Sequence, residues 1–288
     1  MKCRVYKKSN TAFMTTVFPG CMIYFDAFIE SLLLQTDKDF DLLIINDGVV
    51  NLVDYIEKYK EINFLQIFSC NTIVQNRKLG IDTAINLNYK YLIFGDSDDY
   101  FAPNRISISK HYLKNFDIVV NDLSLFNIKH GIYKEKCFSK RLTNNSIISS
   151  KYIEDKNIFG LSNTAVKVSE IHKIIFCKNL IAFDWYLFSQ LLYRNKTAVF
   201  TNETQTYYRQ YENNTVGLGV NSIESIKNSI QVKKIHYECM SKTDTNLDKF
   251  LLQIKFLEKK IDKGDINLDE YKHNDLLWWE NTNYIINN

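Results

Sequence analysis

Short apolar runs, separated by stretches with apolar residues at helical spacing, fill the first third of the chain. Four runs predict strands that are buried on both faces, as in a parallel sheet, and they cover residues 12–18, 41–48, 64–68 and 91–94. Between them, apolar positions recur every three or four residues, which predicts helices over 22–35, 51–60 and 76–87. Alternating strands and helices favour a doubly wound, mostly parallel sheet with right-handed crossovers. We therefore expect an α/β fold.

The pattern continues beyond residue 100 but is less regular. The sequence predicts a helix over 104–113, a strand over 117–121, an apolar helix within 178–193 and a strand over 197–200. Residues 124–150 are polar and mixed, which indicates loops or short antiparallel strands.

A different pattern starts near residue 221. Apolar residues recur at helical spacing on both sides of a turn near 241–246, so 221–288 is expected to be a helical extension of an α/β domain formed by 1–220. Lysines lie among these apolar positions, and they allow two interpretations. Either the helices have a solvated face and an apolar stripe that packs on the core, or a basic face rests on anionic lipid.

Composition and cysteine spacing narrow the class of protein. The 45% hydrophobic and 24% charged content suits a globular protein, and a net charge of +3 is too small to favour nucleic acid as a partner. The six cysteines are widely scattered, so we expect free thiols in a reducing cytoplasm. We see no transmembrane stretch and no signal-peptide core behind the basic N-terminus, so the protein is expected to stay inside the cell.

Three acids directly follow the apolar run 91–94, namely Asp96, Asp98 and Asp99. Burying them without partners would be costly, so this strand end should face solvent or a cation. In open α/β sheets, ligands bind beyond the carboxyl ends of strands, and Mg²⁺ or Mn²⁺ accepts carboxylate oxygens while keeping positions for phosphate. One interpretation is a metal–diphosphate site. The other is an acidic turn that caps the next helix.

Six segments, in order, resemble the family 2 glycosyltransferases. They are 25–36, 39–48, 76–81, 96–99, 183–185 and 207–214, and the resemblance spans about residues 10–219. It implies a GT-A fold, a nucleotide-sugar donor and inversion at the anomeric carbon. A haloacid dehalogenase phosphatase also carries Asp-x-Asp after a strand, but on its first strand, and with Thr or Val where this chain has Tyr100.

The resemblance assigns three residues to the donor. Asp47 would accept a hydrogen bond from the base, typically uracil N3–H, although Asp47-Gly48 also suits an ordinary turn. Phe18 resembles the aromatic residue beside the base, but the family usually has Pro two residues earlier, where this chain has Thr16. Arg77 would lie near the donor phosphates, which suit a guanidinium fork, or would form a surface ion pair.

The same resemblance assigns the acids that act on the reaction. Asp96 would face the ribose or a metal-bound water, and Asp98 would ligate Mn²⁺ or Mg²⁺, which stabilises charge on the departing diphosphate. Asp184 resembles the general base that takes the proton from the acceptor hydroxyl, or it caps the apolar helix that follows.

Three further residues are assigned to the acceptor or the diphosphate. Trp185 would offer a flat face to sugar C–H groups. Arg209 belongs to a motif that many family members end with His two positions later, where this chain has Tyr211. Arg209 or Tyr211 is therefore expected to touch the diphosphate or the acceptor.

We therefore expect a metal-dependent hexosyl- or N-acetylhexosaminyltransferase. It would move a sugar from a nucleotide-sugar donor, UDP-linked by preference, to a hydroxyl of a glycan or lipid-linked acceptor in surface polysaccharide synthesis. A lipid-linked acceptor would bring this cytoplasmic protein to the inner membrane face, with peripheral contact through the C-terminal helices. A homodimer is compatible with the sequence. The alternative is a non-catalytic nucleotide- or carbohydrate-binding protein descended from such an enzyme.

Overall fold

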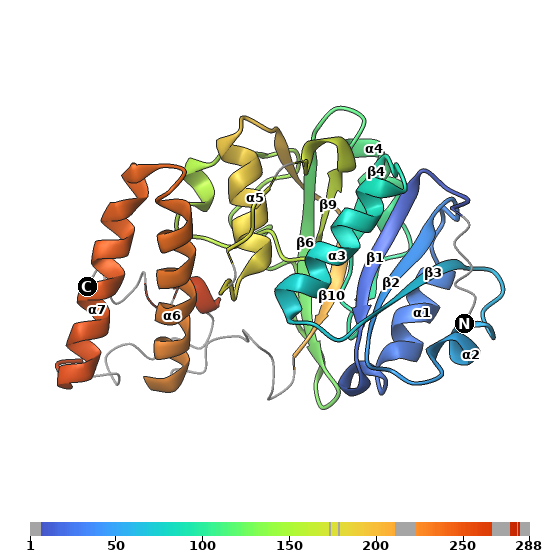
Figure 1. Cartoon of the computed structure of the whole chain (residues 1–288), viewed down its shortest axis with the longest axis horizontal. Coiled ribbons are helices and arrows are strands. Elements are labelled where there is room, and N and C mark those ends of the chain that lie inside the picture. The colour runs from blue at the N-terminus through green and yellow to red at the C-terminus, as the bar shows by residue number, and fades with distance from the viewer. Residues whose placement is uncertain are drawn as a thin grey trace. The chain divides into compact units, whose positions relative to one another are not determined.

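The computed structural model (Figure 1) describes residues 7–172, 174–177, 179–210, 223–266, 277–280 and 282. The chain forms two compact units. The first contains Met1–Ile148, Phe159–Lys173 and Lys196–Arg209, and the second contains Ser149–Ile158, Ile174–Asn195 and Gln210–Asn288. The predicted domain boundary at residue 220 lies outside the described residues and stays a prediction.

A single ten-stranded sheet forms the centre of the first unit as far as the structure describes it. Its strands are β1 (Thr11–Val17), β2 (Asp41–Asp47), β3 (Asn63–Ser69), β4 (Tyr91–Phe94), β5 (Tyr100–Phe101), β6 (Ile118–Asn127), β7 (Gly131–Lys134), β8 (Ile147–Ile148), β9 (Thr164–Lys167) and β10 (Ala198–Arg209). The order is β3-β2-β1-β4-β9-β6-β10-β5, with β7 beside β6 and β8 beside β10. Strands β3, β2, β1 and β4 are parallel, whereas β9 runs antiparallel to both neighbours.

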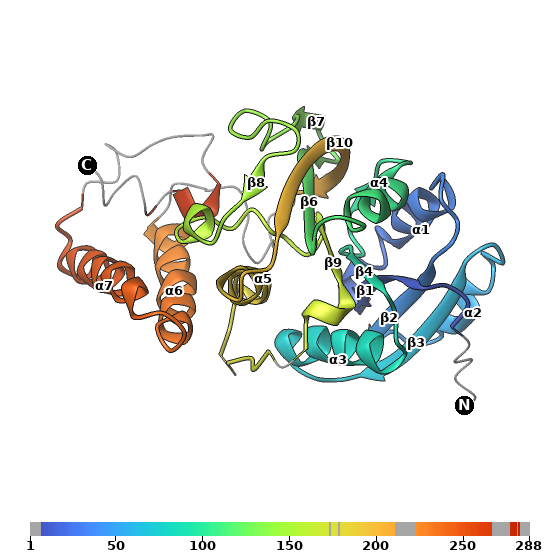
Figure 2. The same cartoon turned by 90° about the horizontal axis from the view of Figure 1, so that it is seen from above.

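Helices cover both faces of this sheet. Helix α3 (Ile73–Asn86) lies on one face, and α1 (Phe25–Leu33) and α4 (Arg105–Tyr112) lie on the other (Figure 2). The short helix α2 (Leu52–Ile56) contributes to the same buried cluster as α1 and α4. Strands β1, β2 and β4 are buried almost throughout, which suits their apolar runs, whereas the edge strand β3 leaves Phe68 exposed.

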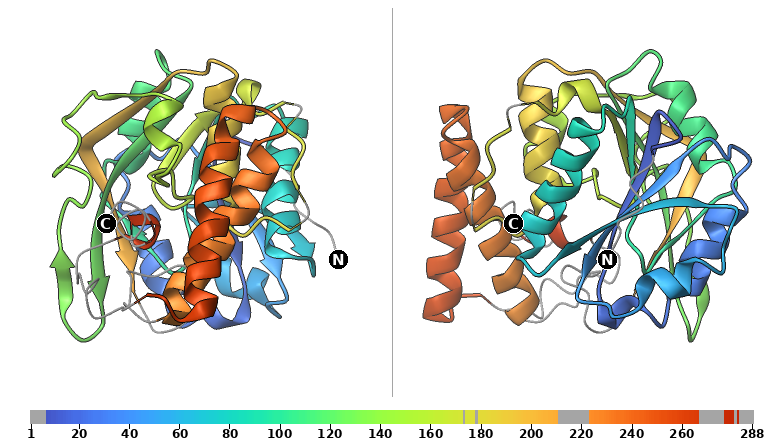
Figure 3. Two further views of the ribbon diagram at one scale, coloured as in Figure 1. Left: turned by 90° about the vertical axis from the view of Figure 1, so that its left-hand side faces the viewer. Right: turned by 45° about the vertical axis from the view of Figure 1, so that its right-hand side comes forward.

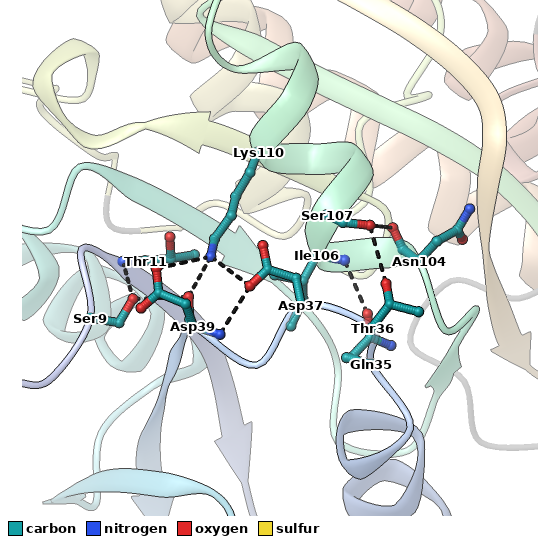
Figure 4. A network of polar contacts seen from close by, with 10 residues as sticks. All are labelled: Ser9, Thr11, Gln35, Thr36, Asp37, Asp39, Asn104, Ile106, Ser107 and Lys110. Atoms are coloured by element: carbon teal, nitrogen blue, oxygen red, sulfur yellow. Dashed lines mark hydrogen bonds and ion pairs between the residues drawn. The ribbon is translucent and has the colours of Figure 1, made fainter.

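Helix α4 is fastened to the chain segment between α1 and β2 (Figure 4). The Gln35 side chain donates to the Ala102 carbonyl at 2.9 Å and accepts from the Ile106 N–H at 3.0 Å. Lys110 of α4 also forms a partly buried ion pair with Asp37 at 3.0 Å. These bonds hold residues 102–110, which follow the acid cluster, against the segment between α1 and β2.

The predicted α/β fold is confirmed, including all strands and helices expected between residues 11 and 121. Two features of the second half were not predicted. Strand β9 is a central strand that the sequence did not indicate, and β10 continues from the predicted 197–200 as far as Arg209. A register shift between Thr201 and Gln205 lets β10 keep pairing with β6 across its polar middle.

The second unit is mainly helical. It contains α5 (Phe183–Tyr193), α6 (Ile223–Met240), α7 (Asp248–Lys263) and the short turns η2 (Lys151–Ile153) and η4 (Thr245–Leu247). Helices α6 and α7 pack side by side (Figure 3), which confirms the predicted helices on both sides of a turn near 241–246. Among the described residues, no helix has the length and apolar character needed to cross a bilayer.

Cys177 and Cys239 form a disulfide within the second unit, with Cα atoms 6.4 Å apart. The prediction that all six cysteines are free thiols is therefore wrong for this pair. The two residues are 62 positions apart, and only the packing of the segment before α5 near the end of α6 reveals their proximity. The prediction of a reducing compartment rested on six free thiols, so the disulfide removes its basis.

A buried aromatic stack forms the core of the second unit. The rings of Trp185 and His236 are parallel with centroids 3.7 Å apart, and Trp185 Nε1 donates to the Ile153 carbonyl at 2.8 Å. Burial, reinforced by the charge of Lys233, lowers the pKa of His236 to about 3. The folded protein therefore keeps this imidazole neutral where an unfolded chain would protonate it.

We expect His236→Phe to remove an acid-induced loss of stability. Since the folded pKa lies below the ordinary value of 6.5, stability should fall as pH drops from 6.5 toward 3, by roughly 3 kcal/mol at pH 4. Phenylalanine keeps a ring on Trp185 but cannot take up a proton. Denaturant unfolding from pH 7 to pH 4 measures the difference, and exposed His111→Phe is the control. A variant as acid-sensitive as the parent would contradict this account.

Candidate active site

The carboxyl ends of β2, β1 and β4 meet at one edge of the sheet, because the three strands are parallel neighbours. Asp47 is the last residue of β2, and Phe18 follows β1 directly. The register pairs Val17 with Asn46, so Phe18 and Asp47 occupy the next position of adjacent strands. The acid cluster follows β4, and the Ser97 hydroxyl donates to the Thr16 carbonyl of β1 at 2.7 Å. Three of the predicted donor-site segments are therefore neighbours.

Phe18 sits in a tight loop with its side chain 40% exposed. Its N–H donates to Cys21 Sγ at 3.3 Å, and the Cys21 thiol donates to the Phe18 carbonyl at 3.0 Å. Pro19 opens the short helix η1 (Pro19–Cys21), which ends the strand. The ring is thus held at the sheet edge by a loop without the proline that the family usually has two residues earlier.

Asp47 precedes a turn that another side chain closes. The Asn46 amide donates to the Val49 carbonyl at 2.8 Å and accepts from the Val49 N–H at 2.7 Å. Gly48 has a φ of +87°, which suits glycine. The Asp47-Gly48 turn is present as expected, but the Asn46 side chain, not that of Asp47, makes these two turn bonds. Asp47 itself is half-buried.

Asp99 is the buried member of the acid cluster. One carboxylate oxygen accepts from the Arg209 N–H at 2.7 Å, and the other accepts from the Ser162 hydroxyl. Burial, with the charges of Asp98 and Asp96, raises the pKa of Asp99 well above its ordinary value. Asp99 therefore acts as an internal anchor that joins the strand end of β4 to β10 and to the loop before β9.

The Arg209 side chain completes this anchor. Its Nε donates to the backbone carbonyl of Asp98 at 2.6 Å, and its guanidinium lies over the rings of Tyr24 and Phe126 at 4.2 and 4.4 Å. Stacking on aromatic rings stabilises a partly desolvated cation. Arg209 thus fixes the backbone of the acid cluster through the Asp98 carbonyl. Sequence analysis assigned Arg209 to the diphosphate or the acceptor and missed this structural contact.

Asp96 and Asp98 are half-buried, whereas Ser97 and Asp99 between and after them are buried. They do not cap the next helix, because β5 intervenes and α4 takes Asn104 as its N-cap residue. A side chain at Gly95 would collide with the rings of Phe13 and Phe101, so glycine is required where β4 turns into the cluster. The interpretation of the cluster as a helix cap is wrong.

Of Arg77, assigned to the donor, and Tyr211, assigned to the diphosphate or the acceptor, the structure describes only Arg77. Arg77 lies in the second turn of α3, which follows β3, and its side chain is half-buried. Since β3 is parallel to β2, the beginning of α3 lies toward the same edge as Asp47. Tyr211 lies outside the described residues.

Asp184 belongs to the second unit, at the second position of α5. The N-cap position is Ala182, so Asp184 is not the cap residue, although its Oδ1 accepts from the Trp185 N–H at 2.8 Å. Trp185 is completely buried between residues of its own unit. The prediction that Trp185 offers a face to a sugar is therefore wrong, since His236 and Trp278 pack on that ring.

Part of this chain is similar in sequence to known glycosyltransferases. Residues 24–152 match the model of the glycosyl transferase family 2. An uncharacterized glycosyltransferase of Rickettsia felis is 34% identical over 116 residues, which are 38% of this chain and 19% of that protein. The chain spans about a fifth of the length of such curated relatives.

Solved structures share the fold. S. aureus TarS residues 1–349 align with a TM-score of 0.61 at 14% identity, over 87% of this chain and 72% of that one. The mannosyltransferase PcManGT of Pyrobaculum calidifontis, in complex with GDP-Man and Mn²⁺, aligns with a TM-score of 0.58 at 9% identity, over 88% and 72%. The predicted resemblance to the family 2 glycosyltransferases is confirmed, and the chain has the GT-A fold.

Proposed function

We infer that this chain is an inverting glycosyltransferase that moves a sugar from a nucleotide-sugar donor, UDP-linked by preference, to a hydroxyl group. The observation that carries this proposal is the meeting of Phe18, Asp47 and the acid cluster at one sheet edge. Ligands of open α/β sheets bind at such an edge. A structure of TarS with UDP-GlcNAc, similar in fold at a TM-score of 0.60 and 13% identity, supports the donor class.

Each residue at this edge has a role that suits its chemistry. The half-exposed Phe18 ring lies beside the base, and the Asp47 carboxylate accepts the uracil N3–H. The Arg77 guanidinium binds donor phosphate oxygens, for which its planar fork is suited. Asp96 faces the ribose. The contacts of Arg209 with Asp99 and with the Asp98 carbonyl hold the backbone of the acid cluster in place before the donor binds.

Asp98, with Asp96, would hold Mn²⁺ or Mg²⁺. The donor set fits such an ion, because two half-buried carboxylates stand on a turn that Arg209 braces from behind. Within the described ranges, no group of three or more His, Cys, Asp or Glu is arranged to hold a metal. A cation at this place would thus rely on donor phosphates as further ligands, as Mg²⁺ commonly does. When bound, it stabilises negative charge on the leaving diphosphate.

Asp184 serves as the general base in this proposal. It takes the proton from the acceptor hydroxyl while that oxygen bonds to the anomeric carbon and the bond from that carbon to the phosphate oxygen breaks. Attack from the face opposite the leaving group inverts the configuration. The acceptor is a glycan or a lipid-linked sugar in surface polysaccharide synthesis, and the transferred sugar is a hexose or an N-acetylhexosamine.

A thermal-shift screen of UDP-GlcNAc, UDP-glucose, UDP-galactose and GDP-mannose, each with and without Mn²⁺, tests the proposal. We expect one UDP-sugar to raise the melting temperature in the presence of Mn²⁺, because a ligand that binds only the folded state stabilises it. Asp47→Ala should lose this shift, and Asp54→Ala, at an exposed acid of α2, should keep it. A chain that binds a donor but never releases UDP would favour a non-catalytic binding protein, and a chain that binds none would refute the donor site.

A further inference from the structure

Two large apolar side chains point away from the packed face of α7. Leu252 is 68% exposed and Phe256 is 61% exposed, and since they are four residues apart they lie on the same side of the helix. On the opposite side, Ile254 and Leu257 are buried, and α7 packs against α6 (Figure 3). The usual pattern, an apolar stripe inside and polar residues outside, is therefore broken on the outer side of α7.

Lysines surround this exposed pair. By helical periodicity the same outer side of α7 carries a set of exposed lysines, namely Lys249, Lys255, Lys259, Lys260 and Lys263. The Lys260 ammonium lies 5.1 Å from the centre of the Phe256 ring. Lys249 lies 3.9 Å from Glu154, so the positive charge is concentrated toward the C-terminal half of the helix.

Of the acids near this face, the exposed Asp248 lies on the same side one turn before Leu252, and the other two lie on its flank and pair with α6. Glu258 pairs with Lys234 of α6 at 2.9 Å, and Asp262 lies 3.7 Å from Lys227 of α6. These pairs neutralise acids of α7 with cations of α6. Because two acids of α7 pair with lysines of α6, the outer side of α7 is more positive than the net charge of the helix.

We propose that this outer side of α7, Leu252 and Phe256 with the surrounding lysines, rests on an anionic lipid bilayer. Apolar side chains that enter the headgroup region, flanked by lysines at the level of the phosphates, are the features that bind an amphipathic helix to such a surface. A solvated face would gain nothing from Leu252 and Phe256, and a nucleic-acid backbone would match the lysines only. The proposal does not depend on the catalytic function, since it concerns binding alone.

Vesicle sedimentation with the full chain tests the proposal. We expect binding to phosphatidylcholine vesicles that contain one quarter phosphatidylglycerol, weak binding to pure phosphatidylcholine, and a decline with added salt. Lys255→Glu/Lys259→Glu should lower the partition coefficient about 20-fold or more, because each lysine near the surface contributes. Leu252→Ser/Phe256→Ser should lower it about 10-fold or more.

Matched substitutions elsewhere separate this face from general charge and polarity. Lys114→Glu/Lys129→Glu and Ile128→Ser/Ile147→Ser alter exposed residues of the first unit and should bind nearly as the parent does. Equal losses in both sets, or equal binding to neutral and anionic vesicles, would overturn the proposal. So would a chain that ignores vesicles but forms a dimer that Leu252→Ser/Phe256→Ser breaks, since a second copy would then cover the face.

Discussion

Replacing Asp98 with alanine is expected to lower metal-supported release of UDP from the donor by about 10³-fold. In the proposed function, the Asp98 carboxylate holds the cation that stabilises the departing diphosphate. The fold should survive, because Arg209 bonds to the Asp98 backbone carbonyl, which the substitution leaves in place. Loss of the Asp98 charge also removes one of the causes that raise the pKa of Asp99. UDP release against Mn²⁺ concentration, together with the melting temperature of each variant, gives the comparison.

Asp54→Ala is the matched control, since Asp54 is an exposed acid of α2 in the same unit and the charge change is the same. It should release UDP at the parental rate. Asp96→Ala is expected to lie between the two, because Asp96 would share the cation with Asp98. Full activity of the parent in EDTA, or a parental rate for Asp98→Ala, would remove Asp98 from the metal role.

The parallel half of the sheet could be predicted because burial on both faces leaves a continuous apolar run in the sequence. β2 and β4 have this property, and once they are parallel neighbours of β1, their ends must meet. The positions of Phe18, Asp47 and Asp96 at one edge follow from that topology. To predict this part of the candidate site, it was enough to know where the strands end, and the sequence marks those ends with a proline or an acid.

The mixed half of the sheet, in which β6 and β10 are parallel and β9 is antiparallel, could not be predicted, because its strands are defined by partners far along the chain. β9 is only four residues long, and it is a strand because β4 and β6 pair with its two edges. The polar residues around Asn202 hide the continuity of β10, which depends on a register shift against β6. The Asp99–Arg209 contact requires this extension of β10. Local sequence patterns therefore could not predict it.

Trp185 shows the same limit at the level of one side chain. An aromatic residue beside a candidate base suits both a sugar platform and a packed core, and its neighbours in sequence do not distinguish the two. The deciding contact is His236 of α6, stacked at 3.7 Å. Pairings between distant helices are set by tertiary packing, which a single sequence does not specify.

Asp184→Asn is expected to lower UDP release from the donor by about 10²-fold or more while leaving donor affinity unchanged. Asparagine keeps an oxygen that can accept the Trp185 N–H, as Asp184 Oδ1 does at 2.8 Å, so the start of α5 should be preserved. What it loses is the ability to take a proton from the attacking hydroxyl. The thermal shift produced by the selected UDP-sugar reports donor affinity, and UDP release to water or to an added glycan reports turnover.

Asp265→Asn provides the control, because Asp265 is an exposed acid of the same unit and should leave both readouts unchanged. The separation of affinity from turnover is what identifies a base. A variant that loses donor binding would indicate that Asp184 holds the donor instead, and a variant as fast as the parent would exclude it as the base.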